Sequence, residues 1–206
     1  MLFRSLQEQI SNLRAVACEV QLDANRKQKQ SRELMEAVVR REELFREYNA
    51  ALRALLKNSD DPAANAVVGQ YLCLELGDWR RGLPFMALGG RKDLALVARH
   101  ELTVLDGKAE IDPSACDPKA VFSLANDLWK TAGDIQSRKP PDSDGLAHAD
   151  AMRRHSASLY ARISSLLTNR LDQGVALKRA MFSDGAEIGK STRLNSSHLV
   201  ISYAVF

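Results

Sequence analysis

The sequence predicts an all-α protein in which a long N-terminal helix, with the pattern of a coiled coil, precedes a bundle of shorter helices. Two observations support this prediction. Residues 6–57 contain neither Gly nor Pro, and their apolar residues recur at alternating spacings of four and three. Later segments twice begin with an Asp-Pro pair, which is typical of a helix start. The chain also lacks an apolar stretch long enough to cross a membrane.

The N-terminal helix is expected over residues 6–57, and at 1.5 Å per residue it would be about 78 Å long. Its apolar residues form one seam, which a coiled-coil partner or another packed helix would cover. A hairpin that breaks near Asn25 is the alternative, but the polar run 25–31 contains no strong turn residue, which favours one helix. The seam consists of Leu6, Ile10, Leu13, Ala17, Val20, Ala24, Leu34, Val38, Phe45, Tyr48, Leu52 and Leu55, with Lys27, Ser31 and Arg41 interrupting it.

Residues 58–181 are expected to form the helical bundle. Its first helix is predicted at 62–76, because Asp61 can cap the exposed N–H groups and Pro62 suits the first turn. Gly77 ends this helix, since a glycine adopts a left-handed conformation at little cost.

The next helix is predicted at 79–88, with Asp78 as its cap. Pro84 lies inside this segment, so the helix is expected to start late or to bend. A connector is expected at 103–117, in which a short strand at 103–105 is an alternative. The remaining helices are expected at about 91–102, 118–132, 146–167 and 171–181.

Two of the predicted helices share one pattern, which resembles a degenerate tetratricopeptide or Sel1-type repeat. The resemblance implies that a small residue in mid-helix lets a neighbouring helix approach, and that a Gly-Asp pair ends one helix and caps the next. The first unit carries Asp61-Pro62, Gly69 and Gly77-Asp78, and the second carries Asp117-Pro118, Ala125 and Gly133-Asp134.

Residues 60–180 also resemble a helical module of large multidomain bacterial proteins, whose pattern is DPxAN, GxYLC and GDWxxGLP. The resemblance implies a scaffold or accessory role, a coiled-coil lead-in, and neighbouring domains of sugar-binding or other extracellular type. It therefore suggests an exported or cell-surface location. The signature residues are Asp61, Pro62, Gly69, Gly77, Asp78, Trp79, Gly82, Leu83 and Pro84, with Trp129 in a later matching stretch.

The two ends of the chain resemble translated sequencing adapters, at residues 1–5 and about 187–206. The remaining segment is then expected to be an internal piece of a longer protein. Residues 182–206 are expected to form a disordered tail, in which Ile188, Leu199, Val200 and Ile201 pack poorly or not at all. A glycine-rich stretch, Gly185 to Ser191, has one residue too few for a phosphate-binding loop and lacks the expected strand before it, so no nucleotide binding is predicted.

Composition excludes a strongly basic protein. The chain has 29 Lys and Arg against 26 Asp and Glu, and without the adapter-like ends the balance becomes 26 against 25. This balance offers no basic stripe for nucleic acid. Cys18, Cys73 and Cys116 are too widely spaced for a metal pair or a disulfide framework, and Cys73 is expected to be a small buried hydrophobe.

Few residues suggest chemistry. Trp79 is expected to anchor the first two bundle helices rather than to line a ligand groove, and Trp129 has the same two interpretations. His148 and His155 share one helix face, but without a third ligand they are expected to be solvated rather than to bind a metal. His100 is expected at a helix end, where a cation is favourable.

The sequence therefore predicts a non-enzymatic helical scaffold, with no catalytic, cofactor-binding or metal-binding residue. Its partner would be another protein or a second copy, held through the N-terminal helix, and no nucleic acid is expected to bind. The alternative is an accessory helical domain of a carbohydrate-active or surface enzyme whose catalytic part lies outside this chain.

Overall fold

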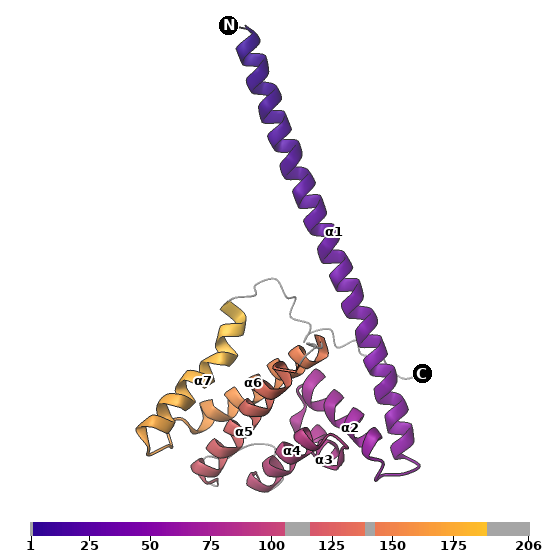
Figure 1. Cartoon of the computed structure of the whole chain (residues 1–206), viewed down its shortest axis with the longest axis vertical. Helices are drawn as coiled ribbons and strands as arrows, with labels where there is room; N and C mark the ends of the chain where they lie inside the picture. Colours follow the sequence, from indigo (N-terminus) through magenta and orange to yellow (C-terminus); the bar gives the residue numbers. More distant parts are fainter. Residues whose placement is uncertain (1, 106–115, 139–142, 189–206) are drawn as a thin grey trace, which may run out of the picture. The chain divides into compact units, whose positions relative to one another are not determined.

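The computed structural model describes the backbone of residues 2–105, 116–138 and 143–188, and the side chains of 17–105, 116–138 and 145–182. Within these ranges every regular element is helical, which confirms the all-α prediction. The chain divides into two compact units, Met1–Ala50 and Ala51–Phe206. The elements are α1 (Leu2–Leu55), α2 (Pro62–Gln70), the π-helical turn η1 (Tyr71–Glu75), α3 (Trp79–Leu88), α4 (Lys92–Val104), α5 (Pro118–Gln136), α6 (Ser143–Ile163) and α7 (Arg170–Ile188) (Figure 1).

α1 is one continuous helix, so the hairpin alternative is wrong. The polar run 25–31 is helical because its long side chains are good helix formers and pair along the surface. Arg26 forms an ion pair with Asp23 at 3.3 Å, and Lys29 approaches Glu33 at 3.9 Å. Such exposed pairs each stabilise a helix by only about 0.3–0.5 kcal/mol.

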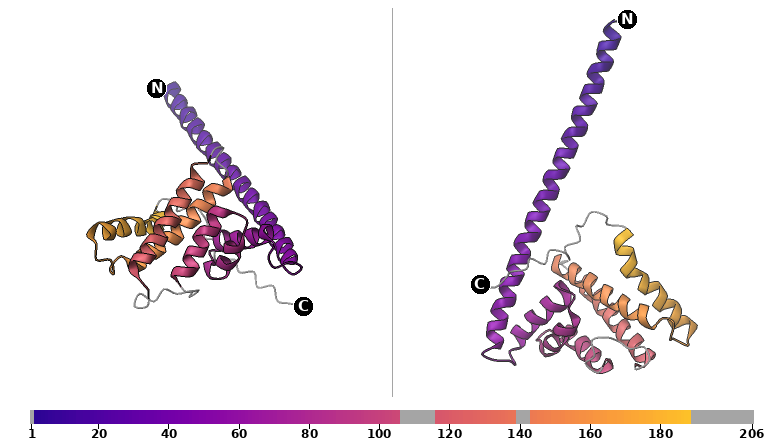
Figure 2. Two further views of the ribbon diagram at one scale, coloured as in Figure 1. Left: turned by 60° about the horizontal axis from the view of Figure 1, so that its bottom comes forward. Right: turned by 180° about the vertical axis from the view of Figure 1, so that it is seen from behind.

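In the second unit, each helix packs against the next one along the chain, and α6 also reaches back to η1 (Figures 1 and 2). α5 and α6 are antiparallel: Gln136 meets Arg153, while Asn126, earlier in α5, meets Tyr160, later in α6. α7 is antiparallel to α6 by the same criterion, because Arg179 contacts Tyr160 and Phe182 lies by Arg153. The resulting core draws on all the bundle helices from η1 to α7.

Both Asp-Pro helix starts are confirmed. The carboxylate of Asp61 accepts hydrogen bonds from the N–H groups of Ala63 and Ala64, at 2.9 and 3.3 Å. Asp117 does the same for Lys119, at 3.0 Å. Each satisfies N–H groups that have no partner within the helix.

Gly77 also behaves as predicted, with a φ of +70° between η1 and α3. Asp78 then caps α3 by accepting from the N–H of Arg81 at 3.1 Å. Of the two alternatives expected for Pro84, a late start or a bend, the late start is wrong, since α3 begins at Trp79 itself. Pro84 is exposed, so the backbone hydrogen bond that it cannot donate is missing on the solvent side of the helix.

Several predicted helix ends shift. The connector expected at 103–117 starts later, and its alternative, a short strand at 103–105, is wrong, because α4 continues to Val104 with Leu102 and Val104 packed on the core. The Gly133-Asp134 pair does not end a helix either. α5 continues to Gln136 because Ile135 is buried, and that burial outweighs the low helix propensity of glycine.

The last two helices also differ from their expected limits. α6 spans Ser143–Ile163 rather than 146–167. α7 runs to Ile188, seven residues past the expected end at 181, so residues 182–188 are helix rather than tail. Gly185 therefore lies in a helix, not in a phosphate loop. The predictions for Leu199, Val200, Ile201 and the side chain of Ile188 lie outside the described residues, as do those for the adapter-like end beyond Ile188.

Candidate functional site

The signature motif forms a tight helical hairpin, made of α2, η1 and α3. At Gly69, an added Cβ would collide with the backbone and Cβ of Met86 in α3. At Gly82, it would collide with Sγ of Cys73 and Cβ of Leu72 in η1. The two helices therefore approach each other because both contact points lack a side chain. The predicted role of Gly69 in close helix approach is confirmed.

Buried groups beside these glycines secure the hairpin. The Asn65 amide is almost fully buried and donates to the carbonyls of Ser59 and Asp61, at 2.8 and 2.9 Å, which fixes the turn before α2. Burial raises the pKa of the Cys73 thiol, and the nearby carboxylates of Glu101 and Asp78 raise it further. Cys73 is therefore protonated and inert, as expected of a small buried hydrophobe.

Ala125 is the counterpart of Gly69 in the second repeat-like segment, which begins at Asp117, and it also lies at a close helix contact. It is fully buried, and the Ser156 hydroxyl of α6 donates to its carbonyl at 2.8 Å. Two small side chains thus let α5 and α6 approach. Both repeat-like segments therefore have the Asp-Pro helix start and the small mid-helix residue, whereas only the first has a Gly-Asp pair that ends its helix.

Trp79 packs on the bundle core, as expected of an anchor, and it joins α3 to α6. Its ring stacks on the His155 imidazole, with centroids 3.8 Å apart and an interplanar angle of 5°. His155 Nε2 lies 2.7 Å from Oε1 of Glu101 in α4. Glu101 is 1% exposed, and its other oxygen, Oε2, has no hydrogen-bond partner among the described residues. This stack connects α3, α4 and α6 through one histidine.

The other two bundle histidines also pair with carboxylates between helices. His148 of α6 lies 3.1 Å from Glu75 of η1, and His100 of α4 lies 2.9 Å from Asp127 of α5. The prediction of solvated His148 and His155 is wrong, because their side chains are only 15% and 13% exposed. His100 is not at a helix end, since α4 continues for another turn. Across the described residues, no three His, Cys, Asp or Glu side chains gather as a metal site.

Trp129 is the anchor of α5, α6 and α7. Its ring makes edge contacts with Tyr160 and Phe182, and the guanidinium groups of Arg179 and Arg153 lie 5.1 and 5.7 Å from its centroid. Both cations are within the range of a cation–π contact. The interpretation of Trp129 as an anchor between helices therefore accounts for these contacts.

Tyr160 adds hydrogen bonds to this anchor. Its hydroxyl donates to Asn126 at 2.9 Å and accepts from Arg179, which also donates to Asn126 at 2.6 Å. Burial raises the pKa of Tyr160, although the Arg179 guanidinium opposes this change. The phenol thus stays neutral and acts as a buried connector.

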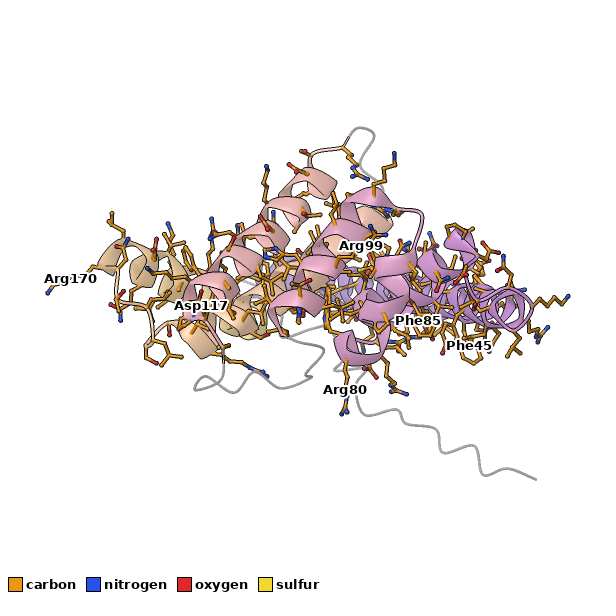
Figure 3. The ribbon with its side chains drawn as sticks, turned by 90° about the horizontal axis from the view of Figure 1, so that it is seen from below. Phe45, Arg80, Phe85, Arg99, Asp117 and Arg170 are labelled. Carbon is orange, nitrogen blue, oxygen red and sulfur yellow. The ribbon has the colours of Figure 1, made fainter. Side chains whose placement is uncertain are left out.

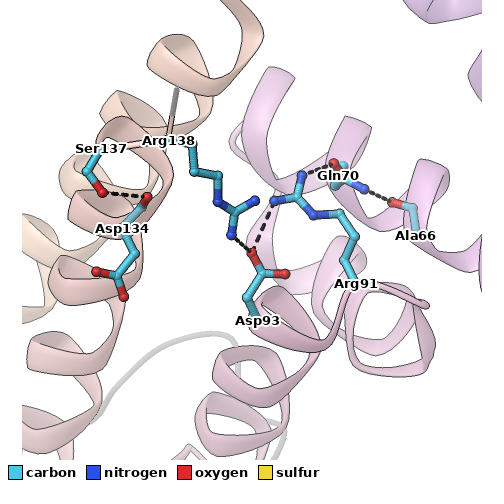
Figure 4. A network of polar contacts seen from close by, with 7 residues as sticks. All are labelled: Ala66, Gln70, Arg91, Asp93, Asp134, Ser137 and Arg138. Atoms are coloured by element: carbon cyan, nitrogen blue, oxygen red, sulfur yellow. Dashed lines mark hydrogen bonds and ion pairs between the residues drawn. The ribbon is translucent and has the colours of Figure 1, made fainter. Parts of the chain in front are cut away.

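Asp93 connects α4 to the end of α5 (Figure 4). It accepts from Arg91 at 3.2 Å and from Arg138 at 2.7 Å, while Arg91 also donates to Gln70 of α2 at 3.2 Å. Burial alone would raise the pKa of Asp93, but the hydrogen bonds from both arginines outweigh it, so the pKa lies below its usual range. By contrast, Arg80 and Arg170 are exposed and point away from the helices (Figure 3).

Sequence reasoning missed Glu101, Ser156, Tyr160 and Arg179. A signal for Glu101 exists, because it lies on the apolar face of α4 at the spacing set by Leu94, Val97 and Ala98. Its partner could not be predicted, since His155 lies 54 positions later in the chain.

No protein-family model matches the chain, and neither does any curated protein or solved structure. In the described bundle, His100, His148 and His155 each pair with a carboxylate of another helix, which is an arrangement that rigidifies a fold.

α1 presents a different kind of surface. Val20, Leu34 and Val38 of the seam are each about half exposed or more, although they are large and apolar. The ion pairs of α1, such as Arg26–Asp23 and Lys29–Glu33, lie away from the a and d positions of the heptad. Among the described residues, no helix is both long and apolar enough to cross a membrane.

Proposed function

We propose that this protein is a helical scaffold whose N-terminal helix holds a second copy of the chain through its apolar seam, while the bundle provides a rigid, independently packed body. The observation that carries the proposal is the exposure of Val20, Leu34 and Val38 along one heptad seam. Large apolar side chains at a and d positions are typical of helices that pack against a partner.

The interactions of the bundle support a mechanical role for that unit. Its histidines and carboxylates, and the Trp129 anchor, join helices to helices. The repeated Asp-Pro starts and the small residues at the close helix contacts, Gly69 and Ala125, favour a tetratricopeptide-like or Sel1-like origin for the bundle.

Two neighbouring valines provide a matched test of the seam. Val38 occupies an a position and is 48% exposed, whereas Val39 occupies a b position and is 47% exposed. Substitution by Glu has the same effect on helix propensity at both sites and adds the same charge. Only at Val38 does it place the charge in the proposed contact.

The measurement is light scattering of the full chain over a series of protein concentrations. The parent chain and Val39→Glu are expected to self-associate, and Val38→Glu to be monomeric. A parent chain that stays monomeric at every concentration would refute the proposal. Equal association of the two variants would show that the copies meet elsewhere.

A further inference from the structure

The seam of α1 carries an internal pattern that selects one orientation for the second copy. Its regular apolar spacing is broken by three polar residues, Lys27, Ser31 and Arg41, and each of these sits at an a or d position. Polar residues at such positions are known to set register and strand orientation at a cost in stability. The possible pairings of two α1 helices therefore differ in which residue of the second copy each of these polar residues faces.

We infer that two copies pair through α1 in an antiparallel arrangement centred at Lys29, close to the midpoint of the helix Leu2–Leu55. This inference rests on the proposed function, because it requires the seam to hold a second copy. In an antiparallel pair, a positions of one helix face d positions of the other. With this centre, Ala17 faces Arg41 of the second copy, Val20 faces Val38, Ala24 faces Leu34, and Lys27 faces Ser31.

A parallel, in-register pair is disfavoured by charge. It would stack Lys27 on the Lys27 of the second copy, and Arg41 on its Arg41, since identical positions then share a layer. Each layer would bring two like charges together at a contact that excludes water, which is destabilising. The antiparallel pair separates both sets of like charges into different layers.

The antiparallel pair also gives each polar residue a suitable neighbour. Arg41 faces Ala17, whose short side chain leaves room for the guanidinium to reach water along its aliphatic stem. Lys27 faces the hydroxyl of Ser31, and Gln28 and Gln30 flank these central layers. Their amide oxygens can accept hydrogen bonds from the Lys27 ammonium group.

The register is selected by the same polar layer. A shift of one heptad in either direction removes Lys27 from Ser31. One shift would place Lys27 opposite Val38 and Ser31 opposite Leu34. Each polar group would then face an aliphatic side chain without a hydrogen-bond partner, which is unfavourable.

Repulsion in the centre of the pair opposes this arrangement. Both copies bring the basic run Arg26 to Arg32 to the same place, as a parallel pair would too. Within each helix, however, Arg26 is already paired with Asp23 and Lys29 approaches Glu33. Salt screens what remains of this repulsion without weakening the apolar layers, so added salt is expected to strengthen the association.

Disulfide formation between copies tests the orientation. Val20→Cys and Val38→Cys are made separately in full chains that also carry Cys18→Ser and Cys116→Ser, while Cys73 is fully buried and stays in place. In the antiparallel pair, residues 20 and 38 of different copies lie in one layer. Two copies of residue 20 are about 27 Å apart along the axis, at 1.5 Å per residue, far beyond disulfide reach.

After mild oxidation, an equimolar mixture of the two variants is expected to give a covalent dimer of one chain of each kind, and neither variant alone is expected to cross-link. Mass labelling of one variant identifies the mixed dimer. A mixture of Val20→Cys with Val39→Cys serves as the control and is expected to stay uncross-linked, because position 39 faces outward.

Cross-linking of either variant with itself would overturn the inference in favour of a parallel pair. A dimer by light scattering without a mixed disulfide would overturn the register, since a one-heptad shift moves the two thiols about 10 Å apart along the axis. Both results leave the proposed function intact. A monomer by light scattering would refute the proposed function and the antiparallel pair together.

Discussion

Leu34 of α1 and Leu128 of α5 lie on the apolar faces of their helices, yet 55% of Leu34 is exposed and Leu128 is fully buried. The same contrast separates the two units of the chain. In the bundle, apolar faces meet other helices, and even Glu101 and Asn65 are buried with hydrogen-bond partners. In α1, residues 17–39 leave their apolar side chains exposed, and only surface pairs reinforce the helix.

This contrast shows that an apolar period alone does not specify a core. The apolar faces of the bundle helices are covered by other helices of the same chain, whereas the described residues of α1's own unit leave its seam exposed. Substitutions in the two units test that difference.

Leu128→Ala is expected to destabilise the bundle by about 2–5 kcal/mol, because it removes a fully buried side chain and leaves a cavity. Leu34→Ala is its counterpart and should leave the free energy of unfolding of the bundle unchanged, while it weakens self-association. Urea unfolding, followed by the fluorescence of the two tryptophans, both in the bundle, measures the first effect. Equal losses for the two variants would show that α1 is part of the same cooperative core.

Gly69→Ala and Gly133→Ala are expected to change the free energy of unfolding in opposite directions. At Gly69 the methyl group would collide with the Met86 backbone, so overpacking should cost about 1–3 kcal/mol. At Gly133 nothing lies within 4 Å of an added Cβ, so the better helix former should stabilise α5 by about 0.5–1 kcal/mol. The same urea titration measures both. A neutral Gly69→Ala would contradict the close approach of α2 and α3.

How much of this architecture could be predicted depends on whether local or distant residues decide it. The starts of α2 and α5 and the end at Gly77 follow from residues a few positions away, and the sequence predicts them correctly. The predicted end at Gly133 is wrong because the burial of Ile135, a tertiary effect, extends α5. The His155–Glu101 contact was equally out of reach, since only the packing of α6 on α4 creates it.

Asp93→Asn is expected to have a smaller effect, about 0.5–1 kcal/mol at neutral pH, because the carboxylate is partly exposed and solvent screens it. The folded state lowers the pKa of Asp93, so its stabilising contribution is full above the unfolded value of about 3.9 and is lost as the pH falls below it. Unfolding free energies of parent and variant should therefore converge in acid. A gap that persists undiminished at low pH would show that packing, not charge, is lost.

Amide hydrogen exchange at a series of protein concentrations tests the contrast between the two units most directly. Because α1 is proposed to gain its partner only from a second copy, protection of residues 17–50 should rise with concentration. Protection of α5 and α6, whose partners lie in the same chain, should stay constant. Concentration-independent protection of both regions, in a range where light scattering reports association of the chain, would contradict the proposal that α1 is the self-association element.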